Sequence, residues 1–65
     1  MVHKMKEWRT VNNLTLEKAA EVLGLESSYV SLLERGLRIP KLRKAIEIED
    51  KTYGFVKPRD WINNN

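Results

Sequence analysis

The chain has 65 residues, with 12 Lys and Arg against 9 Asp and Glu, and a formal net charge of +3. A chain of this length forms one domain with a thin core, and the absence of cysteine excludes disulfide and zinc–thiolate staples. One histidine cannot build a zinc site and no apolar run approaches a membrane span, so we expect no metal, no cofactor and no membrane partner.

The order of apolar and polar residues is helical along the whole chain. We expect an all-α fold, a compact bundle of about five short helices that forms a single domain over residues 1–62. Residues 63–65 are expected to form a short polar tail. The sequence contains no nucleophile–base arrangement and no phosphate-binding glycine loop, so we expect neither an enzyme nor a small-molecule substrate.

The first helix is predicted over residues 3–11. Met5 and Trp8 lie three positions apart and form its inner face. Asn12-Asn13 ends this helix, because Asn tolerates the left-handed backbone found at helix ends. His3, near the start of the helix, is expected to be solvated.

The next segment predicts two helices that cross at a tight turn. Thr15 is a capping residue for the earlier helix, and Ala19 is small enough for a close crossing. Gly24 opens the turn, where a positive φ is needed. The later helix is predicted over residues 27–35 and stops at Gly36. These are the requirements of a helix-turn-helix, formed by the second and third helices.

The fourth helix is predicted over residues 41–51, packed through Leu42, Ala45 and Ile46. A loop follows, and a short closing helix is expected over residues 58–62. The remaining aromatic residues are expected in the core or as a lid over it: Trp8, Tyr53, Phe55 and Trp61.

The third helix has an inner and an outer face. Val30 and Leu33 point toward the core. In a helix-turn-helix the second helix of the pair reads the DNA major groove. We therefore expect the base-reading residues on the outer or leading part of this helix: Ser27, Ser28, Tyr29 and Leu32. The alternative is that the two serines only start the helix.

A basic run follows the third helix directly. Five cations stand within ten residues without an acid among them: Arg35, Arg38, Lys41, Arg43 and Lys44. A cation at the start of a helix opposes the helix dipole, and a phosphate against that helix end would make it favourable. The alternative is an ordinary solvated face. We expect the following residues to contact DNA phosphates: Thr15, Ser31, Arg35, Arg38 and Lys41.

The residues that carry a family resemblance are Leu14, Thr15, Glu17, Ala19 or Ala20, Leu23, Gly24, Tyr29, Val30, Ser31, Glu34, Arg35, Gly36, Arg38 and Pro40. Over roughly residues 4–51 the chain resembles the Cro/cI-type family, which contains the lambdoid phage repressors and Cro proteins. The resemblance implies a cytoplasmic transcriptional regulator that binds a double-stranded DNA operator, as a Cro-like phage or prophage repressor does. It also implies a structural ion pair between Arg9 and Glu34.

Three positions depart from the family pattern and keep a second interpretation open. Leu16 stands where many members carry Gln, Glu26 stands at the usual Ser or Thr cap, and Leu32 cannot donate a hydrogen bond to a base. These residues favour a protein-interaction module on the same scaffold, such as an antirepressor-like or toxin-associated subunit.

One recognition helix contacts only about one half-site, so two copies on a symmetric operator are expected. The sequence predicts a weak homodimer and leaves open whether it forms in solution or only on DNA. The expected contact surface is a small apolar patch in the C-terminal part: Ile48, Phe55 and Val56, with Trp61 as a neighbour.

Overall fold

The computed structural model describes residues 3–62, so the predicted tail at residues 63–65 lies outside the described residues. It contains four α-helices and a closing 3₁₀ turn: α1 (Lys4–Val11), α2 (Leu16–Leu23), α3 (Ser27–Glu34), α4 (Leu42–Lys51) and η1 (Pro58–Trp61). The all-helical prediction is confirmed. The expected fifth α-helix is instead a 3₁₀ turn of four residues. Proline at the first position favours the helical start, but a segment this short closes i→i+3 bonds only.

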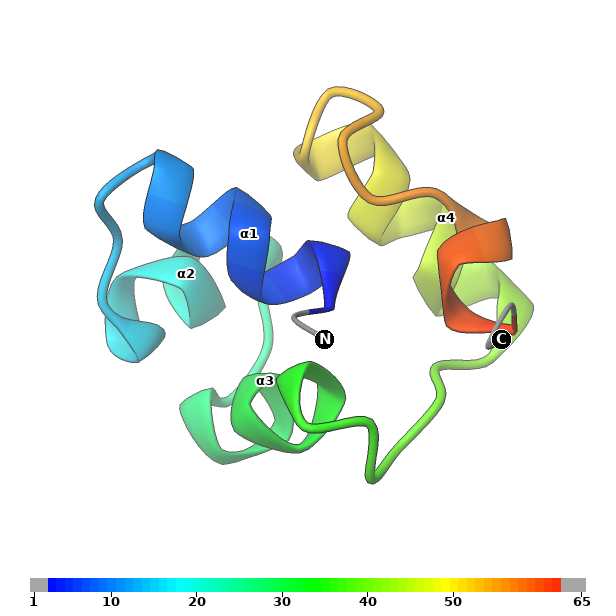
Figure 1. The fold of residues 1–65 in the computed structure, drawn as a ribbon, viewed down its shortest axis with the longest axis horizontal. Helices are drawn as coiled ribbons and strands as arrows, with labels where there is room; N and C mark the ends of the chain where they lie inside the picture. Colours follow the sequence, from blue (N-terminus) through cyan, green and yellow to red (C-terminus); the bar gives the residue numbers. More distant parts are fainter. Residues whose placement is uncertain (1–2, 63–65) are drawn as a thin grey trace.

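The elements surround one small core. In Figure 1, α1 and α2 lie on one side, α3 crosses below them, and α4 with η1 forms the opposite side. Helix α2 packs against α3 and α4, α1 packs against α3, and η1 packs against α4. The buried apolar residues are Met5, Trp8, Ala19, Ala20, Leu23, Val30, Leu33, Ala45, Ile48, Val56 and Trp61. The predicted inner faces of the first and third helices are therefore confirmed.

Helix α4 buries a different stripe from the predicted one. Ala45 and Ile48 are buried, whereas Leu42 and Ile46 are 68% and 44% exposed. Both stripes have helical spacing, so the sequence alone does not choose between them. Helix α2 and the turn η1 pack against α4, and the face that they cover carries Ala45 and Ile48. The predicted packing through Leu42 and Ile46 is wrong.

The segment after α4 is held in place by Thr52, which is buried. Its hydroxyl donates to the carbonyl of Ile48 at 2.8 Å and accepts the N–H of Val56 at 3.1 Å. This bridge fixes the loop so that Val56 is fully buried. Ile48, Val56 and Trp61 are buried and Phe55 is half-buried against the core, so the predicted apolar contact patch does not exist.

The two ends of the described chain meet at an aromatic pair. The rings of His3 and Trp61 are 4.4 Å apart between centroids. Nδ1 of His3 also accepts the N–H of Met5 at 2.9 Å and so caps α1. The expectation of a solvated His3 is wrong, because the fold brings η1 against the start of α1. Tyr53 is also misplaced by the prediction, since it is 97% exposed and belongs to neither core nor lid.

Candidate nucleic-acid interface

The turn between α2 and α3 is formed by interactions between residues that are close in the sequence. The hydroxyl of Thr15 accepts the N–H of Lys18 at 3.1 Å and caps α2. Gly24 ends the helix at φ 71°, and the N–H of Leu25 returns to the carbonyl of Ala20 at 2.9 Å. Ala19 and Ala20 are buried. Their small side chains allow α3 to approach α2 closely, so α3 crosses directly after the turn.

Helix α3 presents a polar outer face. Val30 and Leu33 are fully buried. Ser28 is exposed, and Ser31 and Leu32 are half-buried on the side that the core does not cover. Predicted base-reading residues are thus placed in two environments. Ser28 is exposed, whereas Ser27, Tyr29 and Leu32 are half-buried, and the Tyr29 ring packs against the core.

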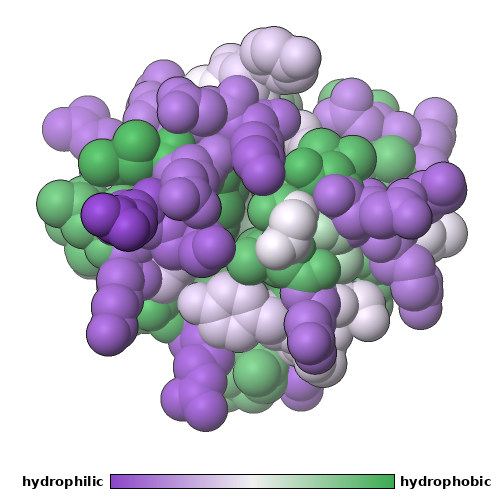
Figure 2. All heavy atoms as spheres, turned by 180° about the vertical axis from the view of Figure 1, so that it is seen from behind, coloured by the Kyte–Doolittle hydropathy of each residue, from purple (hydrophilic) through white to green (hydrophobic). Residues whose placement is uncertain are grey.

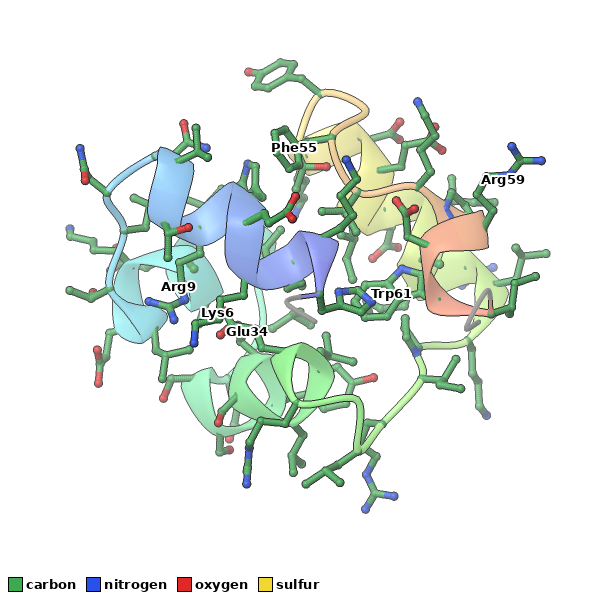
Figure 3. The ribbon with its side chains drawn as sticks, in the orientation of Figure 1. Lys6, Arg9, Glu34, Phe55, Arg59 and Trp61 are labelled. Carbon is green, nitrogen blue, oxygen red and sulfur yellow. The ribbon has the colours of Figure 1, made fainter. Side chains whose placement is uncertain are left out.

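The orientation of α3 relative to α1 is held by a charged clamp. Arg9 Nε lies 2.6 Å from Oε2 of Glu34, and Arg9 Nη2 donates to Oε1 at 3.1 Å. Arg9 Nη1 donates to the carbonyl of Leu14 at 3.1 Å, so one guanidinium joins α1, the following loop and the end of α3. Figure 3 shows the Arg9 side chain pointing from α1 toward Glu34. The hydrogen bond to Glu34 raises the pKa of Arg9 above its ordinary value.

Glu34 is the last residue of α3, and the ion pair with Arg9 neutralises its carboxylate. Its side chain is only 7% exposed. The surface beside the C-terminal end of α3 therefore carries little negative charge of its own. Glu26 differs, because it is exposed at the start of α3 and makes no side-chain capping bond there.

The basic run follows the clamp and is exposed. Arg35, Arg38 and Lys41 are exposed, and among the described residues no ion pair involves them. Lys44 differs because its ammonium lies 3.3 Å from Oε1 of Glu47. Lys41 is the N-cap residue of α4 and makes no side-chain capping bond. Three exposed cations without an ion-pair partner among the described residues thus follow α3 before α4 begins.

Leu16 has a structural role that the sequence did not indicate. It is half-buried and packs against the core, so it does not form an exposed contact surface. Exposed aliphatic residues that the sequence reasoning did not expect lie in α4, where Leu42 and Ile46 are exposed. The sequence analysis missed this exposure because it placed Leu42 and Ile46 in the core. Ala45 and Ile48 are also spaced i, i+3, and that spacing was the pattern that could have indicated the observed buried face of α4.

Other kinds of site find little support in the described part of the chain. Residues 3–62 contain no group of three or more His, Cys, Asp or Glu side chains arranged to hold a metal ion. None of the helices there has the length and apolar character required to cross a membrane.

A close helix pair joined at a left-handed glycine, with an accessible outer face and a basic segment beside it, defines a helix-turn-helix domain. A helix-turn-helix family model matches residues 5–52, and the chain belongs to the Cro/cI-type helix-turn-helix family, a family of DNA-binding regulators. No curated protein and no solved structure matches the chain.

Proposed function

We propose that this chain binds double-stranded DNA as a transcriptional regulator, with α3 in the major groove. The observation that carries the proposal is the uncompensated basic run directly after α3. Arg35, Arg38 and Lys41 are exposed without an ion-pair partner among the described residues. Exposed cations without ion-pair partners create a positive potential that attracts a polyanion. The family membership supports the same function.

The proposed contacts divide into phosphate and base contacts. The phosphate contacts are Thr15, Ser31, Arg35, Arg38 and Lys41. Thr15 already accepts a backbone N–H, and its hydroxyl hydrogen remains available for donation to a phosphate. The base contacts are Ser27, Ser28, Tyr29 and Leu32. Ser28 is the exposed member of that set, and Ser27, Tyr29 and Leu32 are half-buried.

Within this function we propose the role of a Cro-like phage or prophage repressor that acts in the bacterial cytoplasm. Occupation of an operator by a small domain blocks polymerase without further chemistry. Two copies on a symmetric operator, with half-sites about 34 Å apart, would supply the affinity that one recognition helix lacks.

Binding to random-sequence duplex DNA at low and raised salt tests the function. We expect complex formation, measured by fluorescence anisotropy, to weaken steeply as salt rises, because phosphate contacts release counterions. Selection from a random duplex library would then identify the operator. Absence of binding at low salt would contradict the proposal.

The second candidate is a protein-interaction module on the same scaffold. Glu26, exposed at the start of α3, favours it because an acid repels phosphates, and the half-exposed Leu32 offers an apolar contact. The same assay separates the two functions. A module of this kind would bind DNA weakly and would bind its protein partner with little dependence on salt.

The role of Leu32 in readout has its own test. A leucine contacts the methyl group of thymine, and uracil lacks that methyl group. Replacing each thymine of the selected site in turn by deoxyuridine should weaken binding at one position by a fraction of the roughly 1–3 kcal/mol of a good base contact. The Leu32→Ala variant should lose this sensitivity. Equal affinity for every substituted site would remove Leu32 from the readout.

A further inference from the structure

A groove of about 300 Å³, named here the apolar groove, lies between the start of α4 and η1 and is lined mainly by apolar side chains. Three of the lining residues have exposed aliphatic side chains: Ile39 by 63%, Leu42 by 68% and Ile62 by 73%. Figure 2 shows apolar atoms gathered at the left edge of that view, the side on which α4 and the closing turn lie. Exposed aliphatic side chains around a hollow are typical of a surface that binds a partner.

The surroundings of the apolar groove are positively charged. Arg59 is the charged residue among those that line it. Arg38, Lys41 and Arg43 adjoin lining residues in the chain, and all four cations are exposed. No ion pair among the described residues involves any of them, and the chain carries no acid from residue 35 to residue 46. A partner that matches this surface therefore has to supply carboxylates as well as apolar side chains.

The architecture restricts the form of such a partner. The described residues form helices and turns and contain no strand, so an extended peptide has no sheet edge there with which to pair. An amphipathic helix needs only a hydrophobic groove, into which it inserts aliphatic side chains spaced i, i+3 or i+4, and i+7. The volume of the apolar groove is at the low end of the roughly 300–1,000 Å³ of ligand sites, so a few such side chains fill it.

Two of the cations around the groove are also proposed DNA contacts. Arg38 and Lys41 belong to the proposed phosphate contacts, and Lys41 is the N-cap residue of α4, directly before Leu42. Carboxylates that pair with Arg38 and Lys41 would take the place of phosphates there, because both anions need the same donors. Binding of an acidic partner would therefore weaken binding of DNA, and the reverse.

We propose that the apolar groove binds an acidic amphipathic helix of another protein and that this binding releases the chain from DNA. The aliphatic face of the partner helix enters the groove beside Leu42 and Ile62, and its Asp and Glu side chains pair with the surrounding cations. The release from DNA rests on the proposed function, whereas the binding of an acidic helix does not.

Selection from a peptide library tests the chemistry of the partner. The library consists of helical peptides with leucine fixed at positions i, i+3, i+4 and i+7, and with Glu, Lys, Gln and Ser mixed at the other positions. We expect the full chain to select Glu-rich peptides whose affinity falls as salt rises, because the contacts with the surrounding cations are ionic. Selection of Lys-rich peptides, of uncharged peptides or of none would overturn the proposal.

Matched variants of the full chain locate the binding site of the selected peptide. Leu42→Ser should weaken peptide binding by about tenfold, as expected of an interface hot spot. Val11→Ser should have no effect, because Val11 is equally exposed at 68% but ends α1. Arg59→Gln should weaken binding and reduce its salt dependence, whereas Lys51→Gln, at an exposed cation that ends α4, should change neither. Equal effects within either pair of variants would place the peptide elsewhere and overturn the proposal.

A second copy of the chain is the other occupant that the experiment has to distinguish. The Kd of the selected peptide is therefore measured at increasing concentrations of the chain. We expect it to stay constant, because the groove is then free in the absence of the peptide. A Kd that rises with the concentration of the chain would show that a second copy fills the groove, which overturns the proposal.

Competition on a duplex with a single half-site tests the release from DNA. With the selected peptide at about ten times its Kd, the apparent Kd of the chain for the duplex should rise about tenfold. Peptide binding that leaves the affinity for DNA unchanged would overturn this part of the proposal. A wild-type chain that binds no DNA contradicts only the proposed function, because the peptide measurements are made without DNA.

Discussion

His3 holds the start of α1 through an atom that must be deprotonated. Nδ1 accepts the N–H of Met5, so a proton on Nδ1 would remove the cap. Burial lowers the pKa of His3 below its ordinary value of 6.5, and the carboxylate of Asp60 opposes this shift without reversing it. The neutral ring is therefore the form that the fold favours.

The sign of the pH dependence follows from this lowered pKa. A folded-state pKa below 6.5 means that the unfolded chain binds the proton more strongly, so the His3 contribution to stability is complete above pH 6.5 and is lost as the pH falls through the folded-state pKa. We expect the loss to be about 1 kcal/mol or less, the size of a helix cap. Urea denaturation between pH 5 and 7.5 measures it.

The His3→Asn variant is the control for this pH dependence, because Asn caps a helix but does not titrate. The difference in unfolding free energy between wild type and variant should change between pH 7 and pH 5, with the wild type losing more. Parallel curves for the two proteins would show that His3 has no part in the pH dependence.

At the scale of single elements, all four α-helices end in the same way. Each ends with a residue in the left-handed region: Asn13 at φ 57°, Gly24 at 71°, Gly36 at 73° and Tyr53 at 55°. After each helix one N–H donates to the carbonyl five residues earlier, as Leu37 does to Leu32 at 3.0 Å and Gly54 does to Glu49 at 2.8 Å. This is the Schellman pattern, and it gives the domain its short connections.

Tyr53 is the unfavourable member of this set. A bulky residue at positive φ costs about 1 kcal/mol or more, and the Tyr53 side chain, 97% exposed, has almost no packing to offset it. We predict that Tyr53→Asn raises the free energy of unfolding by about 0.5–1 kcal/mol. Chemical denaturation measures the change.

The reciprocal substitution is the control for Tyr53. Asn13 occupies the matching position after α1, so Asn13→Tyr should destabilise the domain by a similar amount. A stabilised Asn13→Tyr variant, or a Tyr53→Asn variant less stable than the wild type, would contradict the explanation from backbone strain.

The ion pair between Arg9 and Glu34 connects α1 to α3, and we expect the two side chains to depend on each other for their effect on stability. Arg9 and Glu34 have side chains that are 17% and 7% exposed. Removing one partner leaves an uncompensated charge, so Glu34→Ala should cost about 2–4 kcal/mol in the free energy of unfolding. The double variant Arg9→Met with Glu34→Leu should cost clearly less than the two single changes added together. Urea denaturation of the four proteins gives the coupling energy.

A coupling energy near zero would show that the clamp adds nothing beyond two independent side chains. DNA binding supplies a second measurement. Because the clamp fixes α3 relative to α1, the double variant should keep its fold and bind the selected operator more weakly than the wild type.

At the scale of the whole molecule, charge is unevenly placed. The cations at residues 35–43 lie beside α3 and the start of α4, whereas the acids Glu47, Glu49 and Asp50 lie toward the other end of α4. A net charge of +3 is modest, so this separation, more than the total, would direct a duplex to the outer face of α3.

The phosphate contacts make a quantitative prediction about this surface. Each lost contact reduces the slope of log affinity against log salt by about 0.9. Alanine variants of Arg35, Arg38 and Lys41 should each lower the slope by about 1 and weaken binding similarly on all sequences. Lys57→Ala, an exposed cation after α4, is the control and should keep the wild-type slope. Unchanged slopes in all three variants would remove these residues from the interface.

The sequence alone determined those features that depend on neighbours within a few positions. The Thr15 cap, the left-handed Gly24 and Gly36 and the inner pair Val30 and Leu33 were all readable, because caps, turns and helix faces are set by short-range chemistry. The Arg9–Glu34 pair spans 25 residues and came only from the family resemblance.

The tertiary structure decided what depends on distant segments. Helix α4 offers two apolar stripes, and only the packing of α2 and η1 determines that Ala45 and Ile48 are buried and Leu42 is exposed. His3 meets Trp61 for the same reason, since no local rule brings the first helix to the last turn. In a domain with so thin a core, one closing turn decides which aliphatic side chains of α4 remain exposed, because burial depends on all the elements that pack together.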